Sequence, residues 1–143
     1  MIVQNPEYQT QVQECFDKHR ALETLGVLLR HVAPGEVDLE LPFNEAFGQQ
    51  DGFLHAGIIT TVVDSACGMA ALTLMPPHAR VLTVEYKVNF MRPAVGEKMV
   101  CRGRVKKPGK TITVTEGEVI AHHDGREKSV AIMTATMITV MPT

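Results

Sequence analysis

The chain has 143 residues, of which 21% are charged, and its formal net charge is −2 at pH 7. This length predicts one domain over residues 1–143, large enough to bury about two thirds of its unfolded surface. The cysteines lie far apart without CxxC or Cys/His ligand spacing, so neither a disulfide framework nor a metal site is expected. The N-terminal residues lack the pattern of a signal peptide, and we therefore expect a cytoplasmic protein.

Positive charge is concentrated in one part of the chain. Residues 80–110 contain nine lysines and arginines against two acidic residues, whereas residues 1–79 contain three against ten. This basic third is a candidate contact for a polyanion, and a solvated charged face is the alternative. The whole chain is slightly acidic and only 5% aromatic, so a small phosphorylated ligand fits better than a nucleic acid.

Periodicity predicts the first elements in chain order. Residues 6–18 have the pattern of an amphipathic helix that begins at Asn5-Pro6, and we expect residues 1–20 to form a helical lid. Residues 25–32 and 36–41 are expected to form a β-hairpin around Pro34-Gly35. A loop over residues 42–54 then precedes a helix over residues 57–74 that is apolar on nearly every face.

Asp64 is the only charged side chain between Asp51 and Arg80, and it lies within this apolar helix. An unpaired carboxylate is costly to desolvate, so it usually persists because it has a partner or a chemical task. A membrane span is disfavoured because the apolar run is barely long enough and contains Asp64, Ser65 and three threonines. We expect a buried core helix that carries the active site; a carboxylate that caps a neighbouring loop is the alternative.

Four long strands are expected after Pro76-Pro77. They cover residues 82–90, 97–107, 111–122 and 126–140, with turn residues at 93–96, 108–109 and 124–125. In the first strand, apolar and polar residues alternate without a fault, which places Thr83 on the polar face. One apolar helix followed by long antiparallel strands packs most economically as an α+β fold in which the sheet curls around the helix.

Three segments of the chain share the spacing of a known family. They are the loop Asp51-Gly-Phe-Leu-His-Ala-Gly57, the carboxylate of Asp64 nine residues after His55, and the strand and turn over residues 82–94, which end in Met-Arg-Pro-Ala. Together they resemble the signature of hotdog-fold acyl-CoA thioesterases, most closely the phenylacetate-degradation (PaaI-like) group. The resemblance implies a homodimer whose sheets join, often paired into a homotetramer, with active sites at the subunit interface. It also implies acyl-CoA as substrate and no metal or redox cofactor.

The resemblance implies roles for residues around the helix. Asp64 matches the catalytic carboxylate, which acts as general base on water or as nucleophile on the thioester. Gln49 matches an Asn or Gln that orients water or polarises the thioester. Thr83 matches a Ser or Thr whose hydroxyl reaches across the dimer interface, although a β-favouring threonine on a wet face is as consistent with composition.

The loop before the helix reads His55-Ala56-Gly57 where many relatives have His-Gly-Gly. The resemblance implies that the backbone N–H of Ala56, at the helix N-terminus, binds the thioester oxygen. The methyl group of Ala56 is compatible with this role only if φ is negative. We expect His55 to brace the loop through its ring nitrogens rather than to act as an acid.

The nucleotide end of coenzyme A is expected in the basic third. Arg92 and the turn Lys107-Pro108-Gly109-Lys110-Thr111 offer cationic side chains and backbone amides to phosphate, with a plain charged hairpin as the alternative. His122 and His123 are adjacent in a strand and point to opposite faces, so we expect no shared metal. Cys67 is expected to be a core side chain.

Two other functions remain open at this point. An acyl-CoA hydratase or dehydratase on the same fold would use His55 with Asp64 for proton transfer, and a non-catalytic acyl-CoA-binding protein would use the fold as a receptor. The acyl group is not specified by the sequence. Four methionines offer an adaptable apolar lining compatible with aryl or medium-length chains: Met69, Met75, Met91 and Met133.

Overall fold

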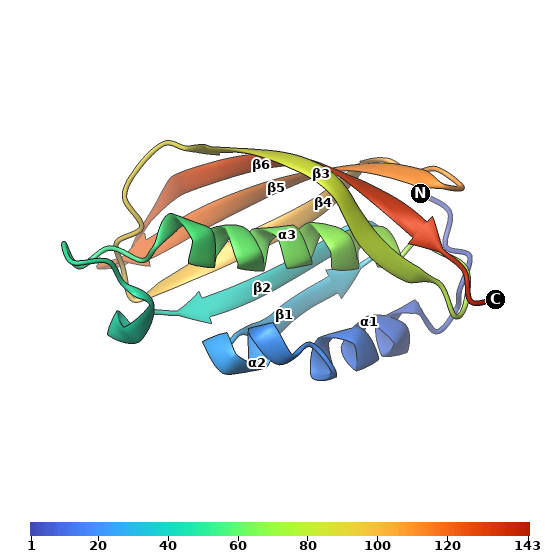
Figure 1. Cartoon of the computed structure of the whole chain (residues 1–143), viewed down its shortest axis with the longest axis horizontal. Helices are drawn as coiled ribbons and strands as arrows, with labels where there is room; N and C mark the ends of the chain where they lie inside the picture. Colours follow the sequence, from blue (N-terminus) through green and yellow to red (C-terminus); the bar gives the residue numbers. More distant parts are fainter.

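The protein is an antiparallel β-sheet curled around one long helix, as the computed structural model of residues 1–143 shows (Figure 1). The sheet has six strands in the order β1-β2-β4-β5-β6-β3. The hotdog fold expected from the sequence is therefore confirmed. The elements are α1 Tyr8–Asp17, α2 Arg20–Leu25, β1 Leu28–Ala33, β2 Glu36–Pro42, the 3-10 helix η1 Glu45–Phe47, α3 Ala56–Leu72, β3 Arg80–Phe90, β4 Lys98–Lys107, β5 Ile112–His123 and β6 Arg126–Val140.

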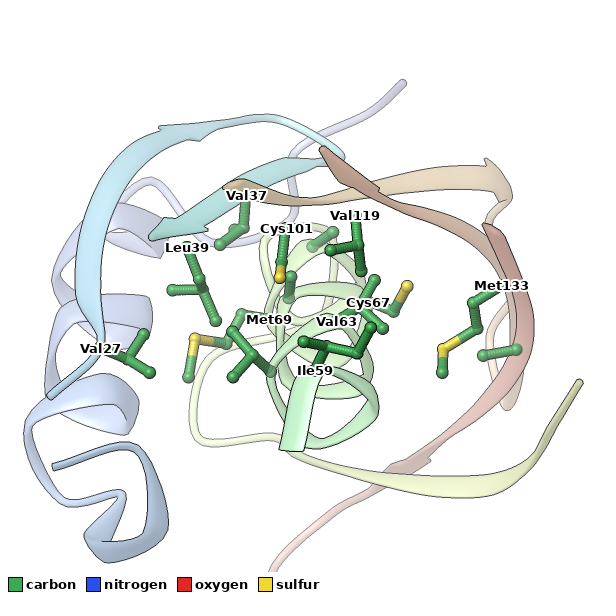
Figure 2. Packing of buried hydrophobic residues seen from close by; sticks show 14 of the residues in the cluster. Val27, Val37, Leu39, Ile59, Val63, Cys67, Met69, Cys101, Val119 and Met133 are labelled. Carbon is green, nitrogen blue, oxygen red and sulfur yellow. The ribbon is translucent and has the colours of Figure 1, made fainter. Parts of the chain in front are cut away.

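The apolar helix α3 is the centre of the core. Two glycines paired across β4 and β5, Gly103 and Gly117, let the helix lie directly on the sheet. A Cβ atom at Gly103 would lie 2.2 Å from the carbonyl oxygen of Ala66, and one at Gly117 would lie 2.6 Å from a methyl group of Val63. Side chains from β2, β4, β5 and β6 surround α3 (Figure 2), including Val37, Leu39, Cys101, Val119 and Met133. This contact fixes the position of the helix and therefore of Asp64.

The N-terminal segment differs from the expectation in one element. Residues 20–25 form the helix α2, and Gly26 ends it with a left-handed φ of 73°, so the strand expected from residue 25 begins only at Leu28. The expectation was wrong because six residues are too few for helical periodicity to be recognised. The first helix, α1, begins at Tyr8, and its Val12 is completely buried in the core. The segment therefore forms part of the wall of the core.

Strand β3 contains a β-bulge that the sequence pattern concealed. Thr83 lies opposite Met137 of β6, but Glu85 lies opposite Thr136, so Val84 is an extra residue. Directly opposed residues share a face of the sheet, and a bulge reverses the alternation that follows it. Thr83 therefore faces α3, and the expectation of a faultless alternation with Thr83 on the polar face was wrong. The bulge turns Thr83 toward α3, whereas the polar residues of β3 after the bulge do not face the helix.

Strand β3 is also an open edge of the sheet. It pairs with β6 on one side only, and four of its large apolar side chains are exposed: Leu82 (59%), Val84 (55%), Tyr86 (45%) and Phe90 (48%). A long edge strand with apolar side chains is a template for pairing with another chain. None of the helices combines the length and the apolar character required to cross a membrane.

Candidate active site

Asp64 lies in the middle of α3, half-buried, next to the edge strand β3. The hydroxyl of Thr83 donates a hydrogen bond of 2.8 Å to one carboxylate oxygen of Asp64. The sequence analysis expected this hydroxyl to reach the carboxylate of a partner subunit, but the structure joins the two residues within one chain. The bulge at Val84 is the physical reason, because it turns Thr83 toward the helix.

The environment of Asp64 changes its acidity. Burial raises the pKa of the Asp64 carboxyl above its ordinary value, because desolvation disfavours the charged form. The hydrogen bond from Thr83 and the nearby His19 act in the opposite direction on this pKa. A carboxylate with a raised pKa is a stronger base than an exposed one, which suits proton abstraction from water.

His19 is a neighbour of Asp64 that the sequence analysis missed. Its Nδ1 accepts the backbone N–H of Leu22 (3.4 Å) at the start of α2, and its Nε2 lies 3.5 Å from the hydroxyl of Ser65. Ser65 follows Asp64 and donates its own hydroxyl to the carbonyl of Thr61 at 3.0 Å. The only signal in the sequence was a possible cap residue before a short helix, and 46 residues separate His19 from Ser65.

The N-terminus of α3 offers an unoccupied hydrogen-bond donor. His55 has extended backbone angles, and its Nδ1 accepts the N–H of Gly57 at 2.8 Å, so it caps the helix and braces the loop. The next residue, Ala56, is exposed, and its N–H donates to no group in the chain. No positive φ occurs at Ala56, so its methyl group is compatible with the backbone. A free amide at a helix N-terminus attracts a negatively charged oxygen.

Gln49 lies beside this helix end. Its loop is held by a bridge between Gly48 and Leu54 and by the N–H of His55, which donates to the carbonyl of Phe47 (3.0 Å). Gln49 is exposed, and its side-chain amide makes no hydrogen bond within the chain. The loop therefore presents a free amide side chain near the start of α3.

The carboxylate of Asp64 and the N–H of Ala56 are far apart within one chain. Asp64 follows Ala56 by eight residues on α3, which at the rise of a helix corresponds to about 12 Å along its axis. Reacting atoms must approach to about 3–3.5 Å, so one thioester carbonyl cannot bind the amide of Ala56 and also face Asp64 of the same chain.

The residues expected to bind coenzyme A are separated in the same way. Arg92 donates to the carbonyl of Ser129 (2.8 Å), which lies opposite Ile120, whereas Lys107 lies opposite Val114. Six residues of β5, roughly 20 Å, separate these two points. The turn 107–111 and Arg92 therefore lie toward opposite ends of the sheet and form no single cluster within one chain.

Cys67 does not take part in this chemistry. It is completely buried, and burial raises the pKa of its thiol to about 12. A thiol with this pKa remains protonated near neutral pH and is a poor nucleophile. Cys67 is a core side chain, as expected.

Comparison with known proteins identifies the family. The profile of the thioesterase superfamily matches residues 51–128, which include the loop, Asp64 and Thr83. The chain belongs to this superfamily, and it is a thioester hydrolase with the hotdog fold.

One relative and two solved structures illustrate the similarity. The chain is 47% identical to a thioesterase family protein from Silicibacter pomeroyi, with a TM-score of 0.93 over 94% of this chain and 99% of that one. It is 32% identical to acyl-coenzyme A thioesterase 13 of Homo sapiens over 81% of this chain and 84% of the relative. The PaaI protein of the E. coli phenylacetic acid degradation operon shares the fold, with a TM-score of 0.86 at 14% identity over 96% of each chain.

Proposed function

We propose that the protein hydrolyses an acyl-CoA to coenzyme A and a carboxylic acid, with Asp64 as general base or nucleophile. The observation that carries this proposal is a half-buried carboxylate held by Thr83 at 2.8 Å on a helix whose N-terminal amide is free. The first group can activate water, and the second can bind the oxyanion that forms from a thioester.

In the general-base route, Asp64 takes a proton from water, and the oxygen of that water attacks the carbonyl carbon. The carbonyl oxygen becomes an oxyanion that accepts the N–H of Ala56. When the oxyanion reforms the carbonyl, the C–S bond breaks, and the sulfur takes the proton that Asp64 removed from water and leaves as the thiol of coenzyme A. In the nucleophilic route, Asp64 attacks the carbonyl itself, the C–S bond breaks, and the thiolate of coenzyme A leaves and takes a proton from solvent. Water then hydrolyses the resulting anhydride to the carboxylic acid and regenerates Asp64. Thr83 orients the carboxylate in both routes, and neither route uses a metal or redox cofactor.

We infer that a second copy of the chain completes the site. The free edge of β3 is apolar and unpaired, and a two-fold axis beside it would set the strands of two copies antiparallel. The helix start lies at the Ala94 end of β3, since the N–H of Leu54 donates to the carbonyl of Ala94 (3.1 Å), whereas Asp64 lies at the Thr83 end. Antiparallel pairing would therefore bring Ala56 and Gln49 of one copy toward Asp64 of the other.

The same two-fold relation accounts for the separated basic residues. Arg92 lies at the end of the sheet near Ala94, and the turn 107–111 lies at the opposite end. Pairing two copies along β3 reverses the ends, so Arg92 of one copy approaches the turn of the other. This supports a shared site for the phosphates of coenzyme A. We further propose that two dimers form a homotetramer and that the protein acts in the cytoplasm, where its three free cysteines would remain reduced.

The two alternative functions are disfavoured by particular contacts. A hydratase would need the His55 imidazole for proton transfer, but Nδ1 of His55 accepts the N–H of Gly57 and caps the start of α3. A receptor for acyl-CoA would not need a carboxylate with a raised pKa next to a hydroxyl.

A thiol-release assay with aryl, short, medium and long saturated acyl-CoAs tests the proposal. We expect release of one thiol for each acyl-CoA consumed, and the preferred chain identifies the acyl group. A hydratase would release no thiol from a saturated substrate, and a receptor would bind acyl-CoA without turnover; either result would overturn the proposal. Light scattering at the assay concentration tests the second subunit, since a fully active monomer is incompatible with a shared site.

A further inference from the structure

A groove runs beside the C-terminal half of α3. The helix α1 forms one of its walls, and the segment from Pro77 to Leu82 forms the other (Figure 1). The volume of the groove is about 890 Å³, within the range of sites for small molecules. Leu72 also lines the groove, and it lies about two turns after Asp64 on the same face of α3. The groove is therefore a candidate extension of the active site.

One end of the groove lies at the carboxylate of Asp64. His19 lines the groove, and its Nε2 lies 3.5 Å from the hydroxyl of Ser65, the residue next to Asp64. On the other wall, Leu82 lines the groove and directly precedes Thr83, which donates to Asp64 at 2.8 Å. A substrate with its thioester carbonyl at Asp64 therefore has the groove directly beside it.

The opposite end of the groove is closed by side chains of the N-terminal segment. Gln11 spans the groove, because its Nε2 donates to the carbonyl of Ala79 on the other wall at 3.0 Å. Its Oε1 accepts a hydrogen bond of 2.7 Å from Asn5, which also lines this end. Between His19 and Gln11, no hydrogen bond or ion pair joins the two walls. The groove is thus unobstructed along its length and closed at the end away from Asp64.

The surface of the groove suits an apolar chain better than an anion. Leu72 and Ala79 are buried and Val81 is half-buried, so the deepest part of the groove is apolar. The charged side chains of the rim are exposed and have both signs: Glu7, Glu14, Lys18 and Arg80. They remain in solvent and present no net charge to a ligand.

We propose that this groove binds the acyl chain of the substrate and selects a straight chain of medium length. Asp64 and Leu72 are eight residues apart on α3, which corresponds to about 12 Å along the helix axis. An extended chain advances about 1.2 Å per bond, so a straight chain of roughly ten carbons reaches the closed end. The inference rests on the proposed function for the thioester. It adds the class of acyl group, with Leu72, Val81 and Gln11 as the residues that determine it.

Protection of Cys15 tests occupancy of the groove without hydrolysis. Cys15 lines the groove and is half-buried, whereas Cys67 and Cys101 are completely buried, so N-ethylmaleimide should label Cys15 alone. S-Decyl-CoA, a thioether that cannot be hydrolysed, should slow this labelling about 10-fold at ten times its Kd. S-Ethyl-CoA has the same nucleotide but no chain to fill the groove, so labelling in its presence, followed by mass spectrometry, should keep nearly the free rate.

Hydrolysis by the labelled protein provides the second measurement. The adduct on Cys15 fills the groove, so kcat/KM for decanoyl-CoA should fall about 10-fold or more, whereas kcat/KM for butanoyl-CoA should be unchanged. Cys15→Ser treated with the same reagent is the matched control, because it cannot be labelled there, and it should keep the preference of the wild type for decanoyl-CoA.

Equal protection of Cys15 by both thioethers, or by neither, would overturn the inference. An adduct that lowers hydrolysis of butanoyl-CoA and decanoyl-CoA equally would also overturn it, as would a preference of the unlabelled protein for an aryl acyl-CoA. Protection by S-decyl-CoA alone, without thiol release from any acyl-CoA, would instead contradict only the proposed hydrolysis.

Discussion

Substitution of Ala56 by proline removes its free backbone N–H with almost no other change to the structure. Ala56 is the first residue of α3, its φ is negative, and its N–H has no partner in the chain. Proline is favoured at this helical position because the missing N–H is not needed there. The preceding residue must be extended, and His55 already has φ −62° and ψ 135°. Ala56→Pro should therefore fold and keep its thermal stability.

We expect Ala56→Pro to lower kcat by about 10²–10³-fold, the usual effect of removing one donor to an oxyanion. KM should change little, because the lost hydrogen bond strengthens in the transition state. Thiol release from a good acyl-CoA substrate is the assay, and Ala56→Ser, which keeps the N–H, is the control. A folded Ala56→Pro protein with more than about a third of the wild-type kcat would refute the role of this amide.

Mixing two inactive variants tests whether the site is shared. Ala56 and Asp64 lie about 12 Å apart on one helix, so the intact site should take one residue from each copy. After unfolding and refolding together, equal amounts of Ala56→Pro and Asp64→Asn should recover about a quarter of wild-type activity, since half the dimers are mixed and each has one intact site. No recovery, with mixed dimers shown by mass spectrometry, would place the site within one chain.

The remaining predictions concern Asp64, His19 and the turn 107–111. Asp64→Asn should lower turnover by orders of magnitude, and retention of more than about a tenth would remove Asp64 from its central role. Because burial raises the pKa of Asp64 above its ordinary value of 3.8, wild-type stability is lost as pH rises from that value through the raised pKa. Asp64→Asn should therefore gain melting temperature relative to wild type as pH rises through this range; a constant difference would contradict the raised pKa. His19→Gln keeps an N–H donor but removes the imidazole whose charge lowers the pKa of Asp64, so the acid limb of the pH–rate profile should move to higher pH, and an unmoved limb would restrict His19 to a structural role. Lys107→Ala/Lys110→Ala should raise KM for acyl-CoA but not for an acyl-pantetheine, and the effect should shrink toward about 1 M salt, where charges are screened within about 3 Å; equal weakening of both substrates would mean that the turn does not bind the nucleotide.

The architecture was readable from local patterns. The apolar helix around Asp64, the turn residues and the long strands 126–140 and 97–107 each predicted an element close to its observed bounds. Periodicity reports burial on each face of an element, and it is strong when the element is long. The short helix α2 was missed because a six-residue segment has too few turns to show such a pattern.

The sequence identified the residues of the candidate site, but it did not show which of them meet. Asp64 stood out in the sequence because a carboxylate is costly in an apolar helix, and the loop and strand motifs added Gln49, His55 and Thr83. Which of these residues meet depends on register and on helix geometry. A single extra residue at Val84 turns Thr83 toward Asp64 within the same chain, and residue spacing does not reveal such a bulge.

The tertiary structure alone decided four further features. It placed His19 near Asp64 and gathered Arg92, Arg126 and Lys128 into one pocket. It also separated Ala56 from Asp64 along α3 and left the apolar edge of β3 uncovered. The physical reason is the same in each case: local sequence determines which face of an element is buried, whereas contacts between residues distant in sequence arise only when the sheet curls around the helix.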